Sequence, residues 1–396
     1  MEANSLSDVR ARRRFLAASA GVGALALLPR AVSGMEPLRV AFINPGKKSE
    51  AYWLAASESM QAAAQSLGVR LEIIYLERDH LRHIAVAREL AARDAAKRPT
   101  HAVYSNDKRM AREMLKILDA ANIKSFLAFS TMLAEDRAEF GMPRQKYKSW
   151  LGALVPRADD AGYLTATALI KRGLTEKRFA SNGRLQLIAL PGDRSTESSI
   201  LRNRGMERAV KEHPDVELVQ TVYADWRRDL GREKARELYV RYPQAQLVWA
   251  GNDLIAFGAM EALEAIGGVP GKSKLFSGVN TSTEAMDAVI SGRLDALAGG
   301  HFIVGAWAVV MLYDLANGRD FADQGLESEH RMFTLFDAPL ARQYLGRFAQ
   351  NAGGNPPIDF RRFSRAHNPT LKRYDFNFAQ LLEPADPAAA RRDAKI

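Results

Sequence analysis

From residue 38 onward, short apolar runs alternate with longer amphipathic stretches. The short runs are rich in Val, Ile, Leu and Phe and end at turn residues, which is typical of buried strands. The longer stretches place apolar residues at i, i+3, i+4 and i+7, as Met114, Ile117, Leu118 and Ala121 do, which is typical of helices. This pattern predicts strands at 38–43, 71–76, 102–104, 126–129, 150–155, 185–190, 216–222, 247–250, 275–279 and 296–298. It predicts helices at 53–67, 81–93, 110–121, 162–171, 198–211, 230–239, 254–266, 283–291 and 302–316.

Strand–helix alternation predicts parallel sheets with helices on both faces. The alternation pauses after 150–155 and then starts again, so the same pattern occurs twice over similar lengths. We therefore expect an α/β fold of two similar Rossmann-like lobes. Residues 338–396 depart from the alternation, being rich in Arg, Asn, Pro and Phe, and we expect an extension that packs on the lobes and frays at its end.

Composition narrows the possible classes of protein. The chain has 396 residues, 47% of them hydrophobic, and no cysteine. This length exceeds what one hydrophobic core usually serves, and the apolar content excludes a disordered chain. A chain without cysteine has no disulfides, thiolate catalysis or zinc ribbons. The formal net charge is +10, but beyond the N-terminal segment the charges are spread along the chain, so we expect no nucleic-acid partner.

Residues 1–34 have the pattern of a secretory signal peptide. A basic region with Arg12-Arg13 precedes an apolar run over 17–28, and small residues typical of a cleavage site follow it. The run is too short to cross a hydrocarbon core, which needs about 20 residues. The arginine pair followed by Phe-Leu resembles the twin-arginine signal, whose route exports folded proteins. We expect cleavage near 33–35 and a periplasmic location, with an uncleaved anchor helix as the alternative.

The residues directly after the predicted strands are the first candidates for a site, because ligands of open α/β sheets lie beyond the carboxyl ends of the strands. They are Asn44, Asn106, Ser130, Thr131, Arg194, Asn252, Asp253, Asn280 and His301. This set is rich in hydrogen-bonding groups and poor in nucleophile–base pairs. There is no G-x-S-x-G motif or P-loop, and no G-x-G-x-x-G follows a predicted strand. His80 and His83 fit a solvated pair at a helix start better than metal ligands, so we expect no catalytic residue, metal or cofactor.

Two motifs resemble those of type I periplasmic solute-binding proteins, the sugar-binding group that includes the ribose-binding proteins. The opening Ile-Asn-Pro at 43–45, followed by Tyr52-Trp53, is similar to the segment whose aromatic pair stacks on a sugar ring. Arg202-Asn-Arg-Gly-Met is similar to the family's R-x-x-G-F, whose arginine reaches the ligand. The resemblance covers about 38–334. It implies that Tyr52, Trp53 and Arg202 contact a ligand.

Three further strand ends extend the resemblance. The segment Gly-Asn252-Asp253-x-x-Ala-x-Gly-Ala is similar to the family's x-N-D-x-x-A-x-G-A, where the Asn binds ligand and the Asp caps a helix. Gly-Val-Asn280 stands where the family has G-F-D, and His301 occupies a hinge position where many members have glutamine. An amide at 280, and Phe-Ser-Thr at 129–131 in place of Asp-Arg, predict a less acidic pocket. A ligand bearing a carbonyl, carboxylate or phosphate then becomes an alternative to a plain sugar.

The resemblance also implies how the chain divides. The N-terminal lobe would comprise 36–153 plus 300–331, the C-terminal lobe 154–299 plus 332–337, and the extension 338–396. Three crossings near 154–156, 298–300 and 332–335 would form a hinge that closes the lobes over the ligand.

Several of these residues have a structural alternative. Trp53 could be a core residue of its helix, and Arg202 could pair with Glu197 on its own helix. Asn252 could close an Asx turn, and His301 could be a packed hinge residue. Asp253 fits a helix cap.

The sequence therefore predicts an exported, monomeric protein that captures a small polar ligand, a sugar or a sugar-like or carboxylated compound, between two lobes. Its expected partner is the permease of an ABC transporter. The alternatives are a ligand sensor for a sensor kinase or chemoreceptor, a periplasmic α/β enzyme and a transcription regulator. The sequence argues against a transcription regulator, because a signal peptide stands at the N-terminus in place of a DNA-binding helix-turn-helix.

Overall fold

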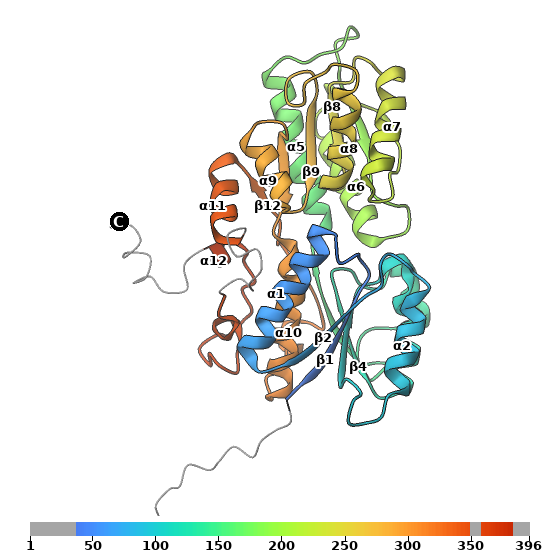
Figure 1. The fold of residues 1–396 in the computed structure, drawn as a ribbon, viewed down its shortest axis with the longest axis vertical. Coiled ribbons are helices and arrows are strands. Elements are labelled where there is room, and N and C mark those ends of the chain that lie inside the picture. Colours follow the sequence, from blue (N-terminus) through green and yellow to red (C-terminus); the bar gives the residue numbers. More distant parts are fainter. Residues whose placement is uncertain (1–36, 349–357, 383–396) are drawn as a thin grey trace, which may run out of the picture. The chain divides into compact units, whose positions relative to one another are not determined.

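The computed structural model describes residues 37–348 and 358–382. The predicted signal peptide at 1–34, its cleavage region at 33–35 and the end of the predicted extension, 383–396, lie outside the described residues. The described residues form two six-stranded sheets with helices around them (Figure 1). The predicted α/β class with two similar, largely parallel sheets is confirmed.

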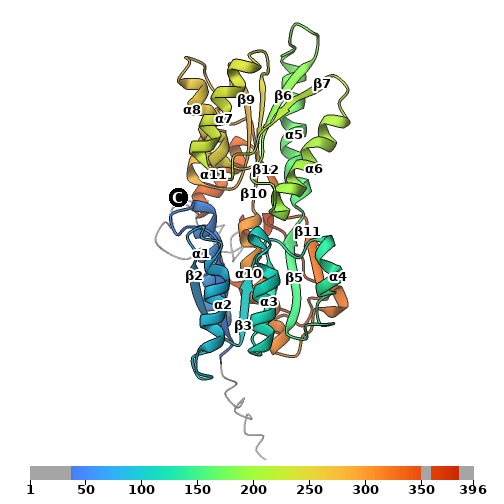
Figure 2. The same ribbon diagram turned by 90° about the vertical axis from the view of Figure 1, so that its right-hand side faces the viewer.

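The first sheet has the strand order β11-β5-β4-β3-β1-β2, and its strand pairs are parallel (Figure 2). Its strands are β1 (Arg39–Asn44), β2 (Arg70–Tyr75), β3 (His101–Tyr104), β4 (Lys124–Ala128), β5 (Trp150–Pro156) and β11 (Glu327–His330). The helices of this first lobe are α1 (Ala51–Leu67), α2 (Arg82–Ala92), α3 (Ala111–Ala120), α4 (Arg137–Phe140) and α10 (Val304–Ala316).

The second sheet has the order β12-β10-β9-β8-β6-β7, and only β12 runs antiparallel to its neighbour among these described strands. Its strands are β6 (Leu185–Leu190), β7 (Val216–Thr221), β8 (Leu247–Ala250), β9 (Leu275–Val279), β10 (Ala296–Gly299) and β12 (Thr334–Phe336). The helices of this second lobe are α5 (Ala158–Thr175), α6 (Glu197–Lys211), α7 (Arg228–Arg241), α8 (Asp253–Glu264) and α9 (Thr283–Ile290).

Burial on both faces explains the near-continuous apolar strands. Every residue of β3, β5 and β8 is buried, as expected for parallel strands covered on two sides. Helix α10 is buried over most of its length, which accounts for its run of apolar residues. Within 37–348 and 358–382, no helix combines the length and the apolar character that a membrane span requires.

The chain passes from one sheet to the other after β5, after β10 and between β11 and β12. Strand β5 stays paired in the first sheet through Pro156, which lies opposite His330, so this sheet ends later than the lobe boundary expected at residue 154. Strand β11 was missed because its sequence, Glu-Ser-Glu-His, has no apolar run. It is a partly exposed edge strand whose position comes from pairing with β5.

The described part of the C-terminal extension contacts both lobes. Helix α11 (Ala338–Phe348) lies against α9 of the second lobe (Figure 1). Residues 358–382, which include α12 (Ala379–Leu382), pack against α1 and α10 of the first lobe. The Ser66 hydroxyl of α1 donates to the Ile358 carbonyl (3.3 Å), and Asp314 of α10 accepts hydrogen bonds from Ser364 and Tyr374.

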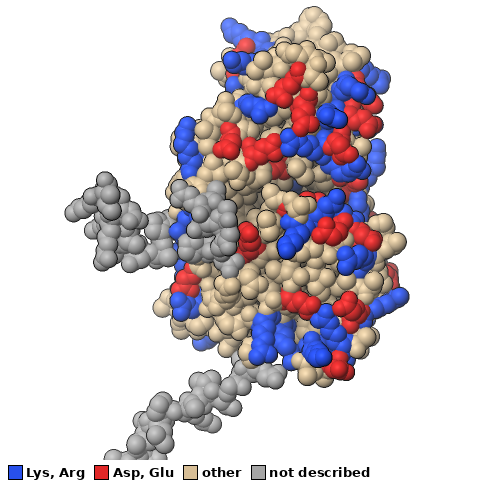
Figure 3. Space-filling view, in the orientation of Figure 1, with Lys and Arg blue, Asp and Glu red and all other residues tan. Residues whose placement is uncertain are grey.

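Lysine and arginine side chains are interspersed with aspartate and glutamate over the face shown in Figure 3. Many of them are paired, as Arg93 is with Glu72 and Glu89 and Arg228 is with Glu261 and Glu284. The positive net charge therefore does not gather into a single patch on that face.

Helices α5 and α6 approach each other closely at two glycines. A Cβ atom on Gly162 would lie 1.8 Å from the carbonyl oxygen of Arg202, and one on Gly205 would lie 2.0 Å from the carbonyl oxygen of Asp159. Only glycine permits this approach, which fixes the position of α6 and of the Arg202 backbone relative to the sheet.

Gly162→Ala is expected to lower the free energy of unfolding by about 1–3 kcal/mol, because the added methyl forces α6 away from α5. Urea denaturation measures the change. The control is Gly346→Ala in α11, where an added Cβ meets no atom within 4 Å and alanine favours the helix. Equal stability of the two variants would contradict the close approach.

Candidate ligand-binding site

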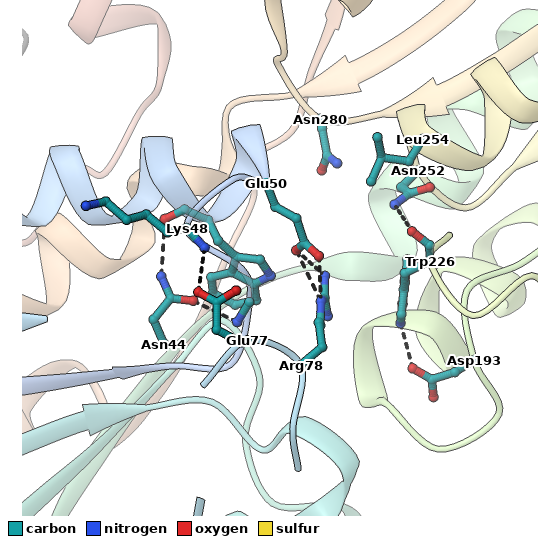
Figure 4. Close-up of polar contacts among 12 residues, drawn as sticks. Asn44, Lys48, Glu50, Glu77, Arg78, Asp193, Trp226, Asn252, Leu254 and Asn280 are labelled. Atoms are coloured by element: carbon teal, nitrogen blue, oxygen red, sulfur yellow. Dashed lines mark hydrogen bonds and ion pairs between the residues drawn. The ribbon is translucent and has the colours of Figure 1, made fainter. Parts of the chain in front are cut away.

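The carboxyl ends of both sheets face a cavity of about 450 Å³. This volume suits a small ligand. Side chains from both lobes line the cavity, and Figure 4 shows some of them, with Glu50 and Arg78 from one lobe and Trp226, Asn252 and Asn280 from the other. Of the predicted site residues, the lining includes Tyr52, Trp53, Arg202, Asn252, Asn280 and His301.

Aromatic rings form walls of the cavity on both lobes. Trp53 of α1 packs edge-on against Phe129, with ring centroids 5.2 Å apart, and both line the cavity. Trp53 is only 8% exposed, so it is at once a core residue and a wall of the cavity. Trp226, from the loop after β7, lines the cavity from the second lobe, and its indole Nε1 donates to Asp193 (2.6 Å). The cavity thus has fixed apolar surfaces on two sides.

Arg202 is a buried cation that pairs with no carboxylate among the described residues. Its side chain comes from α6, and the residue is 5% exposed. Nη1 donates to the Gly251 carbonyl (2.8 Å), and Nη2 lies 3.1 Å from His301 Nε2. No ion pair to Arg202 occurs within the described residues, and its Nε has no hydrogen-bond partner there. The predicted alternative, an ion pair with Glu197, is therefore absent.

Burial lowers the pKa of Arg202 to about 10, which still leaves the guanidinium charged at neutral pH. The guanidinium lies over two rings, 5.4 Å from the Trp226 centroid and 5.8 Å from that of Phe333. Cation–π contacts of this kind stabilise a partly desolvated charge. The cavity therefore holds a cation whose hydrogen-bonding capacity the protein uses only in part.

His301 is neutral in this arrangement. Burial, and then the charge of Arg202, lower its pKa well below the usual value. Because Arg202 donates toward Nε2, the ring proton is assigned to Nδ1, which has no partner among the described residues. The ring stacks on Tyr52 at 4.7 Å between centroids and lies 4.5 Å from Phe333. His301 is thus a packed residue between the lobes that also holds Arg202.

Carboxylates reach the cavity from the first lobe. Glu50 and Arg78 form a pair with contacts of 2.7–3.1 Å (Figure 4). Asp107 also lines the cavity, and within the described residues its carboxylate accepts no hydrogen bond and joins no ion pair. Burial raises the pKa of Asp107, while the charge of Arg78 opposes that rise. Asp107 and Arg202 therefore offer a free acceptor and a free donor from opposite lobes.

The amides of the second lobe line the cavity but are held by the protein. Asn252, and not Asp253 as predicted, caps α8 by accepting from Ile255 N (2.9 Å), and the Asn252 Nδ2 approaches the Trp226 carbonyl (3.4 Å). Asn280, at φ 123°, donates to Asp253 Oδ1 (2.7 Å). The buried Asp253 carboxylate also accepts from Ser282, so it serves the loops after β8 and β9.

Three predicted residues do not line the cavity. Asn44 donates to the Trp53 carbonyl (3.2 Å) and accepts from Gly46 N (2.9 Å), so its amide holds the turn before α1. Asn106 donates to the Thr131 carbonyl (2.9 Å). Arg194 is exposed, with its guanidinium 4.3 Å from the Tyr223 ring. An amide at a strand end can satisfy turn backbone as readily as a ligand, and position alone does not separate the two uses.

Sequence reasoning missed Glu50, Arg78, Asp107 and Trp226. Asp107 directly follows Asn106, so the strand-end rule could have included it. Trp226 lies five residues beyond the end of β7 (Val216–Thr221) and Arg78 three beyond β2 (Arg70–Tyr75), and both have positive φ, 62° and 66°. Their loops turn back toward the cavity, and no local motif in the sequence signals such a turn.

The profile of the periplasmic binding protein domain matches residues 40–320. A solved periplasmic sugar-binding protein from Pseudomonas fluorescens is 35% identical, with a TM-score of 0.78 over 87% of this chain and 100% of that chain. A xylitol-binding protein from Mycolicibacterium smegmatis is 28% identical over 113 residues, which are 28% of this chain and 31% of that protein. A D-apiose import binding protein from Actinobacillus succinogenes is 26% identical over 107 residues, 27% of this chain and 34% of that protein.

The chain belongs to the family of periplasmic binding proteins, of the type I group. The resemblance seen in the sequence is thereby confirmed. The matches to the two curated relatives span only about a third of their lengths. The family comprises solute-binding proteins rather than enzymes. Within residues 37–348 and 358–382, no group of three or more His, Asp or Glu side chains is placed to hold a metal ion.

Proposed function

We propose that this protein captures a neutral sugar or polyol in the cavity between its lobes. The observation that carries the proposal is that the cavity is lined by Arg202, which pairs with no described carboxylate, and from the opposite lobe by Asp107, which accepts no hydrogen bond from the described residues. A hydroxyl can accept from the guanidinium or donate to the carboxylate, so the hydroxyls of one sugar or polyol can satisfy both groups. Xylitol and D-apiose, named for two relatives, are ligands of this class.

A neutral ligand is favoured over an acidic one. The amide at Asn280 predicted a less acidic pocket, but Glu50 and Asp107 bring carboxylates into it from the first lobe. A sugar acid would meet Asp107 at close range, and that repulsion would offset its attraction to Arg202. The rings of Trp53 and Trp226 suit the apolar C–H faces of a sugar or polyol.

Hinge closure follows from the same arrangement. The cavity is lined from both lobes, so separating them would widen its entrance and bringing them together would bury a ligand between them. Gly300 lies at the crossing after β10 with φ 102°, a conformation that glycine adopts without strain. Opening would rotate the lobes about this crossing and the two others, and ligand would stabilise the closed form.

In this proposal the loaded protein delivers its ligand to the permease of an ABC transporter in the periplasm. Export would use the twin-arginine-type signal at 1–34, with cleavage near 33–35. The ligand-bound protein would act as a monomer, because the cavity is completed within a single chain.

A thermal-shift screen tests the proposal. The purified protein is heated with xylitol, D-apiose, other pentoses and hexoses, polyols and sugar acids. We expect a neutral sugar or polyol to raise the melting temperature, since ligand at a hundred times its Kd adds about 2.7 kcal/mol to the stability. No shift with any neutral sugar or polyol, or a shift with sugar acids alone, would contradict the proposal.

Asp107→Asn is expected to weaken binding of the sugar found in the screen at least about tenfold, because a hydrogen bond to a charged group contributes about 1.5–3 kcal/mol. Isothermal titration calorimetry measures the change. The matched control is Glu113→Gln, an exposed carboxylate on nearby α3. Equal affinity of the Asp107 variant and the control would show that Asp107 does not contact the ligand.

A further inference from the structure

One carboxylate joins the two lobes outside the cavity. Glu197 is the first residue of α6 in the second lobe, and its Oε2 accepts a hydrogen bond from the backbone N–H of Thr131, which follows β4 in the first lobe (2.8 Å). The Thr131 hydroxyl donates to Glu327 of β11 (2.8 Å), which also accepts from Arg137 of α4 (2.8 Å). Glu197 therefore has its hydrogen-bond partner, the Thr131 N–H, only when the two lobes are close together.

The surroundings of Glu197 disfavour its charged form. Burial is the main cause, and the carboxylates of Glu329 and Glu327 on β11 add to it, while the Thr131 N–H and Arg137 oppose it. Together they raise the pKa of Glu197 to about 7 from a usual value of 4.5. When protonated, the carboxyl group keeps one oxygen to accept from Thr131 and gains a hydroxyl that can donate to a neighbouring carboxylate.

We propose that Glu197 is a proton-sensitive latch, which stabilises the closed form of the protein when it is protonated and weakens it when it is ionised. This inference rests on the hinge closure proposed above. Opening the lobes removes Thr131 and β11 from Glu197 and returns its carboxyl group to water.

The direction of the pH dependence follows from the difference in the pKa of Glu197 between the open and the closed form. In the open form Glu197 has its ordinary pKa, so closing takes up a proton between about pH 4.5 and 7. The closed form is therefore favoured as the pH falls through that range. Above about pH 7 the group is ionised in both forms, and the closed form bears the full cost of burying the charge beside two carboxylates.

Another contact between the lobes does not respond in this range. Lys108 of the first lobe pairs with Asp193 (3.4 Å) and Asp225 (3.2 Å) of the second. Burial would lower the pKa of Lys108, but both carboxylates raise it overall. Burial would raise the pKa of Asp193, but hydrogen bonds from Thr196 and Ser195 lower it to about 2. The Lys108–Asp193 pair thus stays charged from pH 5 to 8.

Single-molecule FRET across the lobes tests the latch without a ligand. The chain has no cysteine, so Ala120→Cys in α3 and Arg236→Cys in α7, both exposed, give two unique labelling sites. We expect the ratio of closed to open molecules at pH 5, divided by the ratio at pH 8, to be at least about tenfold larger in the wild type than in Glu197→Gln. His301, which is neutral and packed between the lobes in the closed form, titrates in both proteins and opposes closing at pH 5, so comparing the two isolates Glu197.

The control is Glu207→Gln, an exposed carboxylate on the same helix, which should keep the wild-type response. The same dependence on pH in the wild type and in Glu197→Gln would overturn the latch. If the sugar found in the screen closes the lobes while the two proteins respond alike to pH, only the latch fails and the proposed function stands. If neither closes them, the proposed closure fails as well.

Discussion

Replacing Arg202 by alanine is expected to weaken ligand binding about ten- to a hundredfold, with little change in the stability of the ligand-free protein. A hydrogen bond to a charged group contributes about 1.5–3 kcal/mol, and Arg202 lines the cavity with a guanidinium group of which the described residues use only two N–H donors. Stability should change little, because the variant loses contacts to Gly251 and His301 but no longer buries a cation without a carboxylate partner. Calorimetric titration and urea denaturation measure the two effects.

The matched control is Arg204→Ala, an exposed arginine two residues further along α6. Its removal should leave both affinity and stability near the wild-type values. If Arg202→Ala instead destabilised the free protein strongly and left the affinity unchanged, Arg202 would be a structural residue.

Asp314→Ala is expected to lower the free energy of unfolding by at least about 3 kcal/mol. The Asp314 carboxylate is fully buried on α10 and accepts from the Ser364 hydroxyl, the backbone N–H groups of Arg365 and Ala366, and the Tyr374 hydroxyl, at 2.5–3.0 Å. Its removal leaves several buried donors without a partner, each at a cost of about 1–3 kcal/mol. Urea denaturation measures the loss, and limited proteolysis reports whether 358–382 leaves the first lobe.

Asp323→Ala is the control, because Asp323 is exposed and pairs with Arg365 of the same segment. An exposed ion pair contributes at most about 1 kcal/mol. Similar losses in the two variants would mean that the buried carboxylate does not anchor the extension.

The fold could be predicted from the sequence because strands that are buried on both faces of a sheet consist almost entirely of apolar residues. Strands such as β8 (Leu-Val-Trp-Ala) are apolar throughout, and the helices between them repeat at the helical period. Strand β11 could not be found this way. It is a polar edge strand, and its place depends on β5, which lies far away in the sequence.

The candidate site could be predicted only in part. The strand-end rule and the family motifs led to Arg202, Asn252 and His301, all of which line the cavity. The same rule included Asn44 and Asn106, whose amides hold turns instead. Whether a strand-end amide faces a ligand or holds a turn depends on which backbone groups near it need a hydrogen-bond partner, and this is known only from the folded chain.

The pKa values and protonation states of buried groups were the hardest properties to predict from the sequence. The neutral state of His301 comes from its burial between Tyr52 and Phe333 and from the charge of Arg202. The raised pKa of Glu197 comes mainly from its burial, to which two glutamates on β11, about 130 residues away in the sequence, add. The residues that surround His301 and Glu197 are distant from them in the sequence, so no local pattern predicts these pKa shifts.

Native mass spectrometry of the purified protein with an equimolar mixture of neutral sugars and polyols, including xylitol and D-apiose, tests the central proposal most directly. We predict one bound molecule per chain, released with its mass unchanged, and loss of that complex in Arg202→Ala but not in Arg204→Ala. Failure of every sugar and polyol to bind, or release of a molecule whose mass has changed, would contradict a sugar-capturing protein.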